Sequence, residues 1–160
     1  MKIYGQVEEL NRELRRLEGK KIVFTNGVFD LLHAGHIELL EFAKNSGDYL
    51  IVGVNDDNSV KRLNKGEERP IFPLEQRMKI LAALEAVDFV IPFSEDTPLE
   101  LIKRLHRVDI LVKGGDYRLH QVVGREEVEK KGGKVLLFDF QTDISTTAII
   151  KRITPRLWTK

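Results

Sequence analysis

The stretch Lys21–His36, KIVFTNGVFDLLHAGH, determines how the rest of the chain is organised. Its apolar, β-branched run Ile22–Thr25 is typical of a buried strand. The pair Asn26-Gly27 ends this run, and a glycine lets a ligand approach the backbone because it has no Cβ. Apolar residues then recur at helical spacing over 37–43. A strand, a glycine turn and a helix start together predict an anion site, since free N–H groups and the helix dipole point at the gap.

Four polar or small residues lie in that gap: Asp30, His33, Gly35 and His36. Two imidazoles beside a helix start suggest a phosphate that undergoes chemistry. The alternative is a core strand followed by two structural histidines, and the histidine spacing alone does not separate the two interpretations. The whole string Thr25–His36 in a strand–turn–helix setting favours the functional one.

The composition excludes several other classes of protein. A chain of 160 residues fits one domain, and 42% hydrophobic with 32% charged residues is typical of a globular protein with an ionic surface. The net charge of +1 argues against nucleic-acid binding through the overall field. Without cysteine, disulfides and zinc–thiolate sites are excluded. No run approaches the ~20 apolar residues of a membrane span, so we expect a cytoplasmic protein without a membrane or nucleic-acid partner.

Strand and helix patterns alternate along the remaining chain. Strands are predicted over 22–25, 49–54, 88–91, 108–112 and 134–138, and a basic loop over 55–62. Helices are predicted over 7–17, 37–43, 74–84, 97–106 and 126–131, and from Ser145 onward, with Thr97 and Ser145 as caps. This alternation predicts a single α/β domain, a Rossmann-like doubly wound parallel sheet with helices on both faces. An amphipathic helix over 1–19 precedes a main domain over 20–160, and it either packs on that domain or forms a homodimer.

Candidate binding residues follow the carboxyl ends of the strands, where ligands bind in open α/β sheets. After the second strand, Asn55 precedes several cations that suit a triphosphate or a solvated loop. Two prolines stiffen Arg69–Arg77, which presents Arg69 or Arg77 to a ligand unless Arg77 forms a structural ion pair with Glu75 or a neighbour.

Two further loops complete this set. Paired glycines in Lys113–Tyr117 allow close backbone approach, and Lys113 and Asp116 at the same rim favour a ligand over a plain turn. In Ile144–Thr147, Ser145 suits an N-cap. Its neighbours in the first turn suit phosphate binding through hydroxyls and free N–H groups.

These motifs resemble the HxGH nucleotidyltransferases, in their cytidylyltransferase-like branch. That family transfers a nucleoside monophosphate from a nucleoside triphosphate to a small phosphorylated acceptor and releases pyrophosphate. The resemblance spans roughly 20–153. The strings NGVFDLLHAGH, KRL, RPIFPLEQR, LVKGGDY and STT look most like the D-glycero-β-D-manno-heptose 1-phosphate adenylyltransferases. This branch implies transfer of AMP from ATP to a sugar 1-phosphate, giving ADP-heptose for lipopolysaccharide, and a stand-alone transferase is expected.

The resemblance also implies roles for individual residues. The implied catalytic residues are His33, His36 and Lys61, with Lys65 as second choice to Lys61. The implied nucleotide-binding residues are Thr25, Asn26, Gly27, Phe29, Gly35, Lys113, Gly114, Asp116, Ser145, Thr146 and Thr147. The implied acceptor-binding residues are Asp30, Asn55, Arg69 and Arg77. Mg²⁺ is expected to bind mainly through the ATP phosphates, without a dedicated protein site.

Three alternatives remain at this point. The first is a cytidylyltransferase acting on glycerol 3-phosphate or a similar alcohol phosphate. Its closing motif reads R-T-x-G-I-S-T-T, whereas Phe140 stands here at the arginine and Asp143 at the glycine, which favours ATP over CTP. The second is a non-catalytic nucleotide-binding module. The third, a zinc hydrolase using His33 and His36, lacks a convincing further ligand set.

Overall fold

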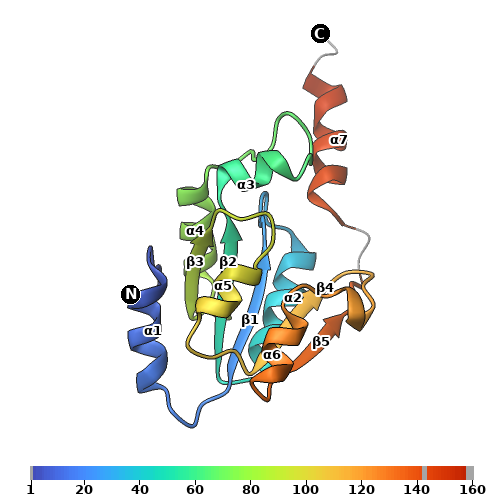
Figure 1. Ribbon diagram of the computed structural model, residues 1–160. Coiled ribbons are helices and arrows are strands. Elements are labelled where there is room, and N and C mark those ends of the chain that lie inside the picture. The colour runs from blue at the N-terminus through green and yellow to red at the C-terminus, as the bar shows by residue number, and fades with distance from the viewer. Residues whose placement is uncertain (1, 142–143, 158–160) are drawn as a thin grey trace.

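One parallel sheet forms the centre of the molecule (Figure 1). The computed structural model describes residues 2–141 and 144–157, and these contain five strands in the order β3-β2-β1-β4-β5. The strands are β1 (Ile22–Gly27), β2 (Tyr49–Asn55), β3 (Phe89–Phe93), β4 (Ile110–Gly114) and β5 (Lys134–Phe138). The chain runs outward from β1 to β3 and then returns to β4 beside β1. The predicted doubly wound fold is therefore confirmed, with its switch point between β1 and β4.

Helices follow most of these strands. They are α1 (Val7–Arg16), α2 (Ala34–Asn45), α3 (Asp57–Arg62), α4 (Leu74–Ala83), α5 (Leu99–Arg104), α6 (Arg125–Lys130) and α7 (Thr146–Leu157), with a 3₁₀ turn over Leu119–Gln121. Within the described ranges, none of these helices is both long and apolar enough to cross a membrane.

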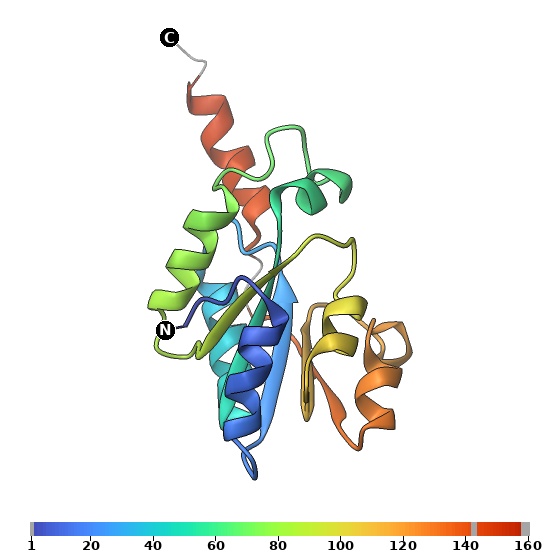
Figure 2. The ribbon, with the colours of Figure 1, turned by 60° about the vertical axis from the view of Figure 1, so that its left-hand side comes forward.

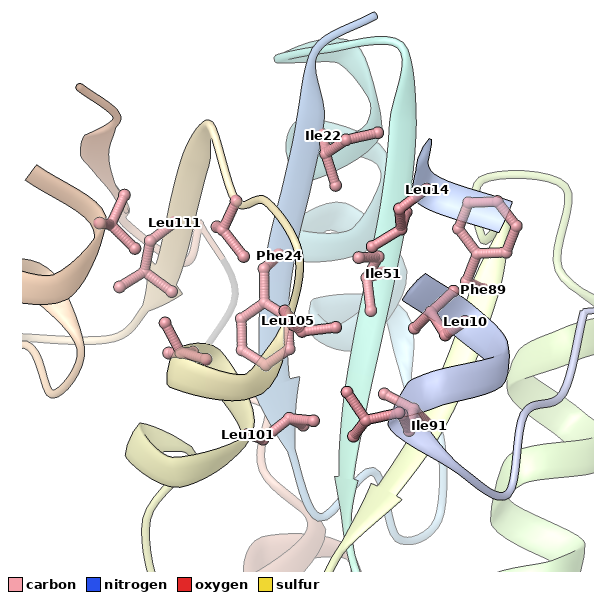
Figure 3. Packing of buried hydrophobic residues seen from close by; sticks show 14 of the residues in the cluster. Leu10, Leu14, Ile22, Phe24, Ile51, Phe89, Ile91, Leu101, Leu105 and Leu111 are labelled. Atoms are coloured by element: carbon pink, nitrogen blue, oxygen red, sulfur yellow. The ribbon is translucent and has the colours of Figure 1, made fainter. Parts of the chain in front are cut away.

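Both faces of the sheet are covered, and each face has its own core. Helices α2 and α4 lie on one side, and α5 and α6 on the other (Figure 2). The N-terminal helix α1 belongs to the second side: its buried leucines pack among Ile51, Phe89 and Ile91 (Figure 3). Alternate residues of each strand face opposite cores. The sequences of the central strands are therefore continuously apolar rather than alternating.

Three local predictions were wrong. The basic segment after β2 is not a loop, because the carboxylate of Asp56 accepts a hydrogen bond from the Ser59 N–H (2.7 Å) and starts α3. Thr97 does not cap the next helix, which begins after Pro98 without a side-chain cap. Strand β3 also continues past Pro92, where the predicted strand ended. It lies at the sheet edge, where a missing N–H is tolerated.

The two strands at the switch point separate toward their carboxyl ends. Strands β1 and β4 pair only at Val23–Ile110 and Phe24–Leu111, although both continue for three further residues. Beyond this point, the fully buried Thr25 hydroxyl donates to the Val112 carbonyl (2.9 Å). This side-chain bond takes the place of a backbone bond, so the strands stay joined while their ends open. The Thr25 hydroxyl therefore has no hydrogen left to donate to a nucleotide.

Leu14→Ala tests whether α1 is part of the domain core. Leu14 is 1% exposed and packs in the core shared with β1, β2 and β3. The substitution should lower the free energy of unfolding by about 2–5 kcal/mol, the usual range for a buried leucine. Urea denaturation measures it, and Glu9→Ala on the exposed face of the same helix is the control. Equal stability of the two variants would mean that α1 is an appendage.

Candidate active site

Two cavities open at the carboxyl edge of the sheet. The histidine cavity has a volume of about 360 Å³ and is lined by His33, His36, Asp30, Arg69, Phe140 and the start of α7. The Asn55 cavity has a volume of about 260 Å³ and is lined by Asn55, Lys113, Asp96, Tyr117 and Gln121. Both are also lined by Asn26, Gly27, Val28 and Lys65. The cavities therefore meet directly above the end of β1.

The alternation of β-strands explains why there are two cavities. Side chains two or four positions apart on a strand lie on the same side of the sheet. Asn55 on β2 therefore shares a side with Ile51, and Lys113 on β4 shares it with Leu111. Both of these apolar residues pack in the core beneath α1, α5 and α6. The histidines belong to α2, on the opposite side. Each cavity thus lies above a different face, and a chain turn only three residues long separates them.

The two histidines form a stacked pair at the start of α2. Their ring centroids lie 3.8 Å apart, and the planes meet at 30°. The backbone N–H of His33 donates to Nδ1 of His36 (3.2 Å). An accepting Nδ1 carries no proton, so neutral His36 holds its proton on Nε2 and can donate it to a ligand. Nδ1 of His33 is buried against the first turn of α2 and makes no hydrogen bond of normal geometry with the described residues.

The surroundings keep both imidazoles neutral. Burial, together with the nearby His33, Arg69 and Lys65, lowers the pKa of His36 to about 4, although Asp30 acts in the opposite direction. Burial likewise lowers the pKa of His33. The pair therefore acts as hydrogen-bond donors at neutral pH rather than as cations.

Asp30 fixes the loop between β1 and α2. Its carboxylate is 1% exposed and accepts hydrogen bonds from Arg69 Nε (2.7 Å) and from the backbone N–H groups of Ile71 (2.7 Å) and Phe72 (2.9 Å). Both carboxylate oxygens are thus occupied. The prediction that Asp30 binds the acceptor does not fit this geometry, because the carboxylate holds the turn after β1 instead.

Arg77 is also structural. Its guanidinium is fully buried and donates to the carbonyls of Val28 (2.7 Å), Asn55 (2.8 Å) and Phe72 (2.9 Å), and to Asp57 (2.7 Å). The predicted acceptor contact is wrong, because no donor of this group reaches a cavity. Its ion-pair partner is Asp57 from α3 rather than Glu75.

Lys65, and not Lys61, is the cation at the site. Lys61 lies exposed on α3 and lines neither cavity, because the unpredicted helix turns it outward. Lys65 follows that helix and lines both cavities. Burial and the charge of the neighbouring Arg69 lower the pKa of Lys65. Burial and the charge of Lys65 in turn lower the pKa of Lys113. Cations that depress one another's pKa mark a place where an anion would be stabilised.

The start of α7 closes the histidine cavity. The Ser145 hydroxyl accepts a hydrogen bond from the Ala148 N–H (3.1 Å), which confirms the predicted cap. The buried Thr146 hydroxyl donates to the Asp30 carbonyl (2.6 Å), so it tethers α7 and has no hydrogen left for a phosphate. Thr147 lines the cavity and is exposed. Of the three predicted phosphate-binding hydroxyls, those of Ser145 and Thr147 keep a hydrogen to donate, and that of Thr146 does not.

Phe140 forms one wall of the histidine cavity. A Cβ on Gly114 would lie 2.8 Å from its ring, and a Cβ on Gly35 would lie 3.4 Å from it and 3.1 Å from the His33 ring. These two glycines bring the aromatic ring close to the helix start, although neither lines a cavity. Asp116 is exposed and lines neither cavity, so the structure does not bring it into the site. Asp143 lies outside the described residues.

Sequence reasoning missed two polar residues of the Asn55 cavity. Asp96 comes from the β3–α5 connection, and Gln121 from the 3₁₀ turn after β4. Neither belongs to a motif, and only their position after a strand end indicates a ligand. No group of three or more metal-binding side chains occurs in 2–141 or 144–157.

Comparisons with known proteins agree with this architecture. Residues 24–152 match the family model described as cytidylyltransferase-like. The bifunctional protein HldE of Sodalis glossinidius (strain morsitans) is 57% identical over 141 residues, covering 88% of this chain and 29% of that protein. HldE of Yersinia pestis (strain Pestoides F) is 56% identical over 138 residues, which cover 86% of this chain and 29% of that protein. The chain therefore spans less than a third of these relatives.

Two solved structures share the fold. The lipopolysaccharide core biosynthesis protein from Thermoplasma volcanium GSS1 has a TM-score of 0.63 and 30% identity, covering 79% of this chain and 100% of that one. The pantoate-beta-alanine ligase from Francisella tularensis has a TM-score of 0.61 and 20% identity, covering 89% of this chain and 68% of that one. At this identity the likeness supports the fold alone.

His36→Gln tests the neutral histidine. Between pH 6.5 and about 4, the unfolded chain takes up a proton at this position that folded His36 resists, so acidification favours unfolding. The stability that neutral His36 contributes is complete above pH 6.5 and declines toward pH 4. The wild type should therefore lose more free energy of unfolding over this interval than His36→Gln, as measured by urea denaturation at several pH values. An NMR titration showing the His36 imidazole titrating near 6.5 would contradict the assignment.

Proposed function

Because the chain belongs to the cytidylyltransferase-like family, we propose that it transfers AMP from ATP to a sugar 1-phosphate and releases pyrophosphate. The proposed acceptor is heptose 1-phosphate, and the product is ADP-heptose for lipopolysaccharide core synthesis. The sequence motifs of the heptose branch support this proposal. So do the 56–57% identity to HldE and the likeness to a lipopolysaccharide core biosynthesis protein.

The observation that carries this function is the junction of the two cavities. A transferase must bring two phosphorylated substrates together so that one attacks the other. Here two cavities share residues at the end of β1 and Lys65, and each lies above its own face of the sheet. We assign ATP to the histidine cavity, because helix starts and histidine donors suit a polyphosphate. The acceptor then occupies the Asn55 cavity.

The reaction is an in-line displacement. A phosphate oxygen of the acceptor forms a bond to the α-phosphorus of ATP, and the bond from that phosphorus to the bridging oxygen of the β-phosphate breaks. The attacking phosphate is already ionised, so no base is needed. Catalysis then rests on alignment and on donors that meet the developing charge.

Specific groups are in place for these tasks. Nε2–H of His36 donates to an α-phosphate oxygen, and the positive end of α2 adds to this effect. Lys65, at the junction, neutralises charge on the reacting phosphates. The loss of one such preorganised donor typically costs about 2.7–4 kcal/mol of the activation barrier.

Mg²⁺ would arrive with the nucleotide. The carboxylate at the cavity, Asp30, already accepts three hydrogen bonds, and the described residues offer no cage. The ion would therefore be held by phosphate oxygens and water, and it would reduce the charge of the leaving pyrophosphate.

The base preference tests the proposed function directly. Wild-type protein with heptose 1-phosphate should use ATP over CTP by roughly 100-fold or more in kcat/KM, because a site that hydrogen-bonds one base leaves groups unpaired with another. A pyrophosphate-release assay with four nucleotides and several sugar 1-phosphates measures this, with glycerol 3-phosphate as the competing acceptor. Equal or better use of CTP with glycerol 3-phosphate would establish the cytidylyltransferase alternative instead.

Thr147→Val tests the position of the triphosphate. Loss of this hydroxyl should raise the KM for ATP about tenfold and leave the KM for the sugar phosphate nearly unchanged, because only the nucleotide reaches α7. Steady-state kinetics with each substrate varied measures both constants. Thr154→Val, an exposed threonine on the same helix, is the matched control. An effect confined to the acceptor would reverse the assignment of the two cavities.

A further inference from the structure

Asp96 brings an acidic group to the Asn55 cavity from a connection that no sequence motif marks. This connection joins β3 to α5, and three of its residues in succession, Asp96, Thr97 and Pro98, line the cavity. Lys65 and Lys113 line the same cavity and suit the phosphate of a substrate. Among the described lining residues, Asp96 carries the one carboxylate. A carboxylate repels a phosphate, so its place in this cavity requires another part of the ligand.

Helix α3 lies beside this connection and holds it in place (Figure 1). Nε of Arg62 donates to Oδ1 of Asp96 (2.7 Å), and Nη2 of the same guanidinium donates to the Ser94 carbonyl. The Ser59 hydroxyl donates to the Glu95 carbonyl (2.8 Å). Three consecutive residues of the connection are thus bonded to one helix. The carboxylate therefore has its position before any ligand binds, which reduces the cost of binding.

The ion pair with Arg62 does not by itself account for this carboxylate. The side chains of Arg62 and Asp96 are 48% and 61% exposed, and an exposed ion pair contributes little to stability. Among the described residues, only Oδ1 of Asp96 accepts a hydrogen bond, so Oδ2 keeps its lone pairs for a ligand. The pair therefore orients the carboxylate and leaves one of its two oxygens free to accept.

The chemistry of a carboxylate restricts what Oδ2 can bind. An ionised carboxylate only accepts hydrogen bonds, and an ionised phosphate likewise offers only acceptors. Hydroxyl groups are the donors that a sugar presents, and their hydrogen bonds to a charged acceptor are stronger than those to a neutral one. Asp96 lines the Asn55 cavity and not the histidine cavity, whereas Lys65 lines both. This layout suits a phosphate toward Lys65 at the junction and hydroxyl groups toward Asp96.

We infer that Asp96 determines the specificity of the Asn55 cavity for a polyhydroxylated phosphate ester. Its Oδ2 accepts hydrogen bonds from hydroxyl groups of the ester, and its charge disfavours inorganic phosphate, which offers no such donors. The lysines attract both anions, and the carboxylate separates them. The inference rests on the proposed function for placing the acceptor in this cavity. Arg62 is a positioning residue that acts through Asp96.

The ratio of two affinities tests the hydroxyl contact. Calorimetry with the full chain and without ATP gives dissociation constants for heptose 1-phosphate and for inorganic phosphate. The wild type should bind the ester about tenfold or more tightly than phosphate, and Asp96→Ala should lose most of this preference with the charged hydrogen bonds. Its affinity for inorganic phosphate should stay equal or rise, because a repulsion is removed. A wild type without the preference, or a variant that keeps it, would overturn the inference.

Glu100→Ala is the matched control. Glu100 forms an exposed ion pair of the same kind with Lys103 (2.8 Å) but lines neither cavity, so this variant should keep the wild-type ratio. Loss of the ratio there too would overturn the inference. The calorimetric result needs no turnover, so it tests the inference even where the proposed transfer of AMP fails. In turnover, Asp96→Ala should raise the KM for heptose 1-phosphate severalfold and leave the KM for ATP nearly unchanged, and the reverse pattern would overturn the inference.

Arg62→Ala tests the positioning role and provides a second variant where Asp96→Ala folds poorly. Without the guanidinium the carboxylate is free to turn, so the preference for heptose 1-phosphate over inorganic phosphate should fall severalfold. In the double variant Arg62→Ala/Asp96→Ala, removal of Arg62 should cause no further fall in this preference, because its effect passes through Asp96. Additive losses would mean that Arg62 merely supports the fold, and would overturn its positioning role.

Discussion

The buried carboxylate of Asp30 is the constraint on which the whole reactive edge depends. It joins the loop after β1 to the segment before α4, and its own carbonyl binds the start of α7. A buried charge is tolerated only when it is paired and hydrogen-bonded, so these segments must come together for the chain to fold. On either side of it, Phe29 and Leu31 adopt left-handed φ angles of 51° and 50°. Such strain persists only where the surroundings enforce it.

The buried guanidinium of Arg77 performs the complementary task at the same segment before α4, where Phe72 bonds to both Asp30 and Arg77. It binds carbonyls from the β1 loop, the end of β2 and the segment before α4. Together, the buried carboxylate of Asp30 and the buried guanidinium groups of Arg69 and Arg77 fix the segments that surround the two cavities. Donors held in this way need little reorganisation when charge develops on a phosphate. The structural charges and the catalytic donors are thus separate sets of residues.

Patterns that depend on neighbours in sequence were predictable, and contacts between distant segments were not. The parallel sheet, its five strands, the Ser145 cap and the approach of His33 and His36 to an anion site follow from periodicity and a local signature. The roles of Thr25, Thr146 and Arg77 do not, because each polar group meets a carbonyl 49 to 116 residues away. The preference for Lys61 over Lys65 was wrong for a related reason. The side chain of Asp56 caps the start of α3, and this helix determines in which direction the following cations point.

The placement of the two cavities on opposite faces of the sheet has a consequence for how such enzymes diversify. The lining of the histidine cavity comes mainly from α2 and the start of α7, and that of the Asn55 cavity from the end of β2, the β3–α5 connection and the turn after β4. Mutations that reshape the second set leave the reacting groups in register, so a new acceptor specificity can evolve while the chemistry is conserved.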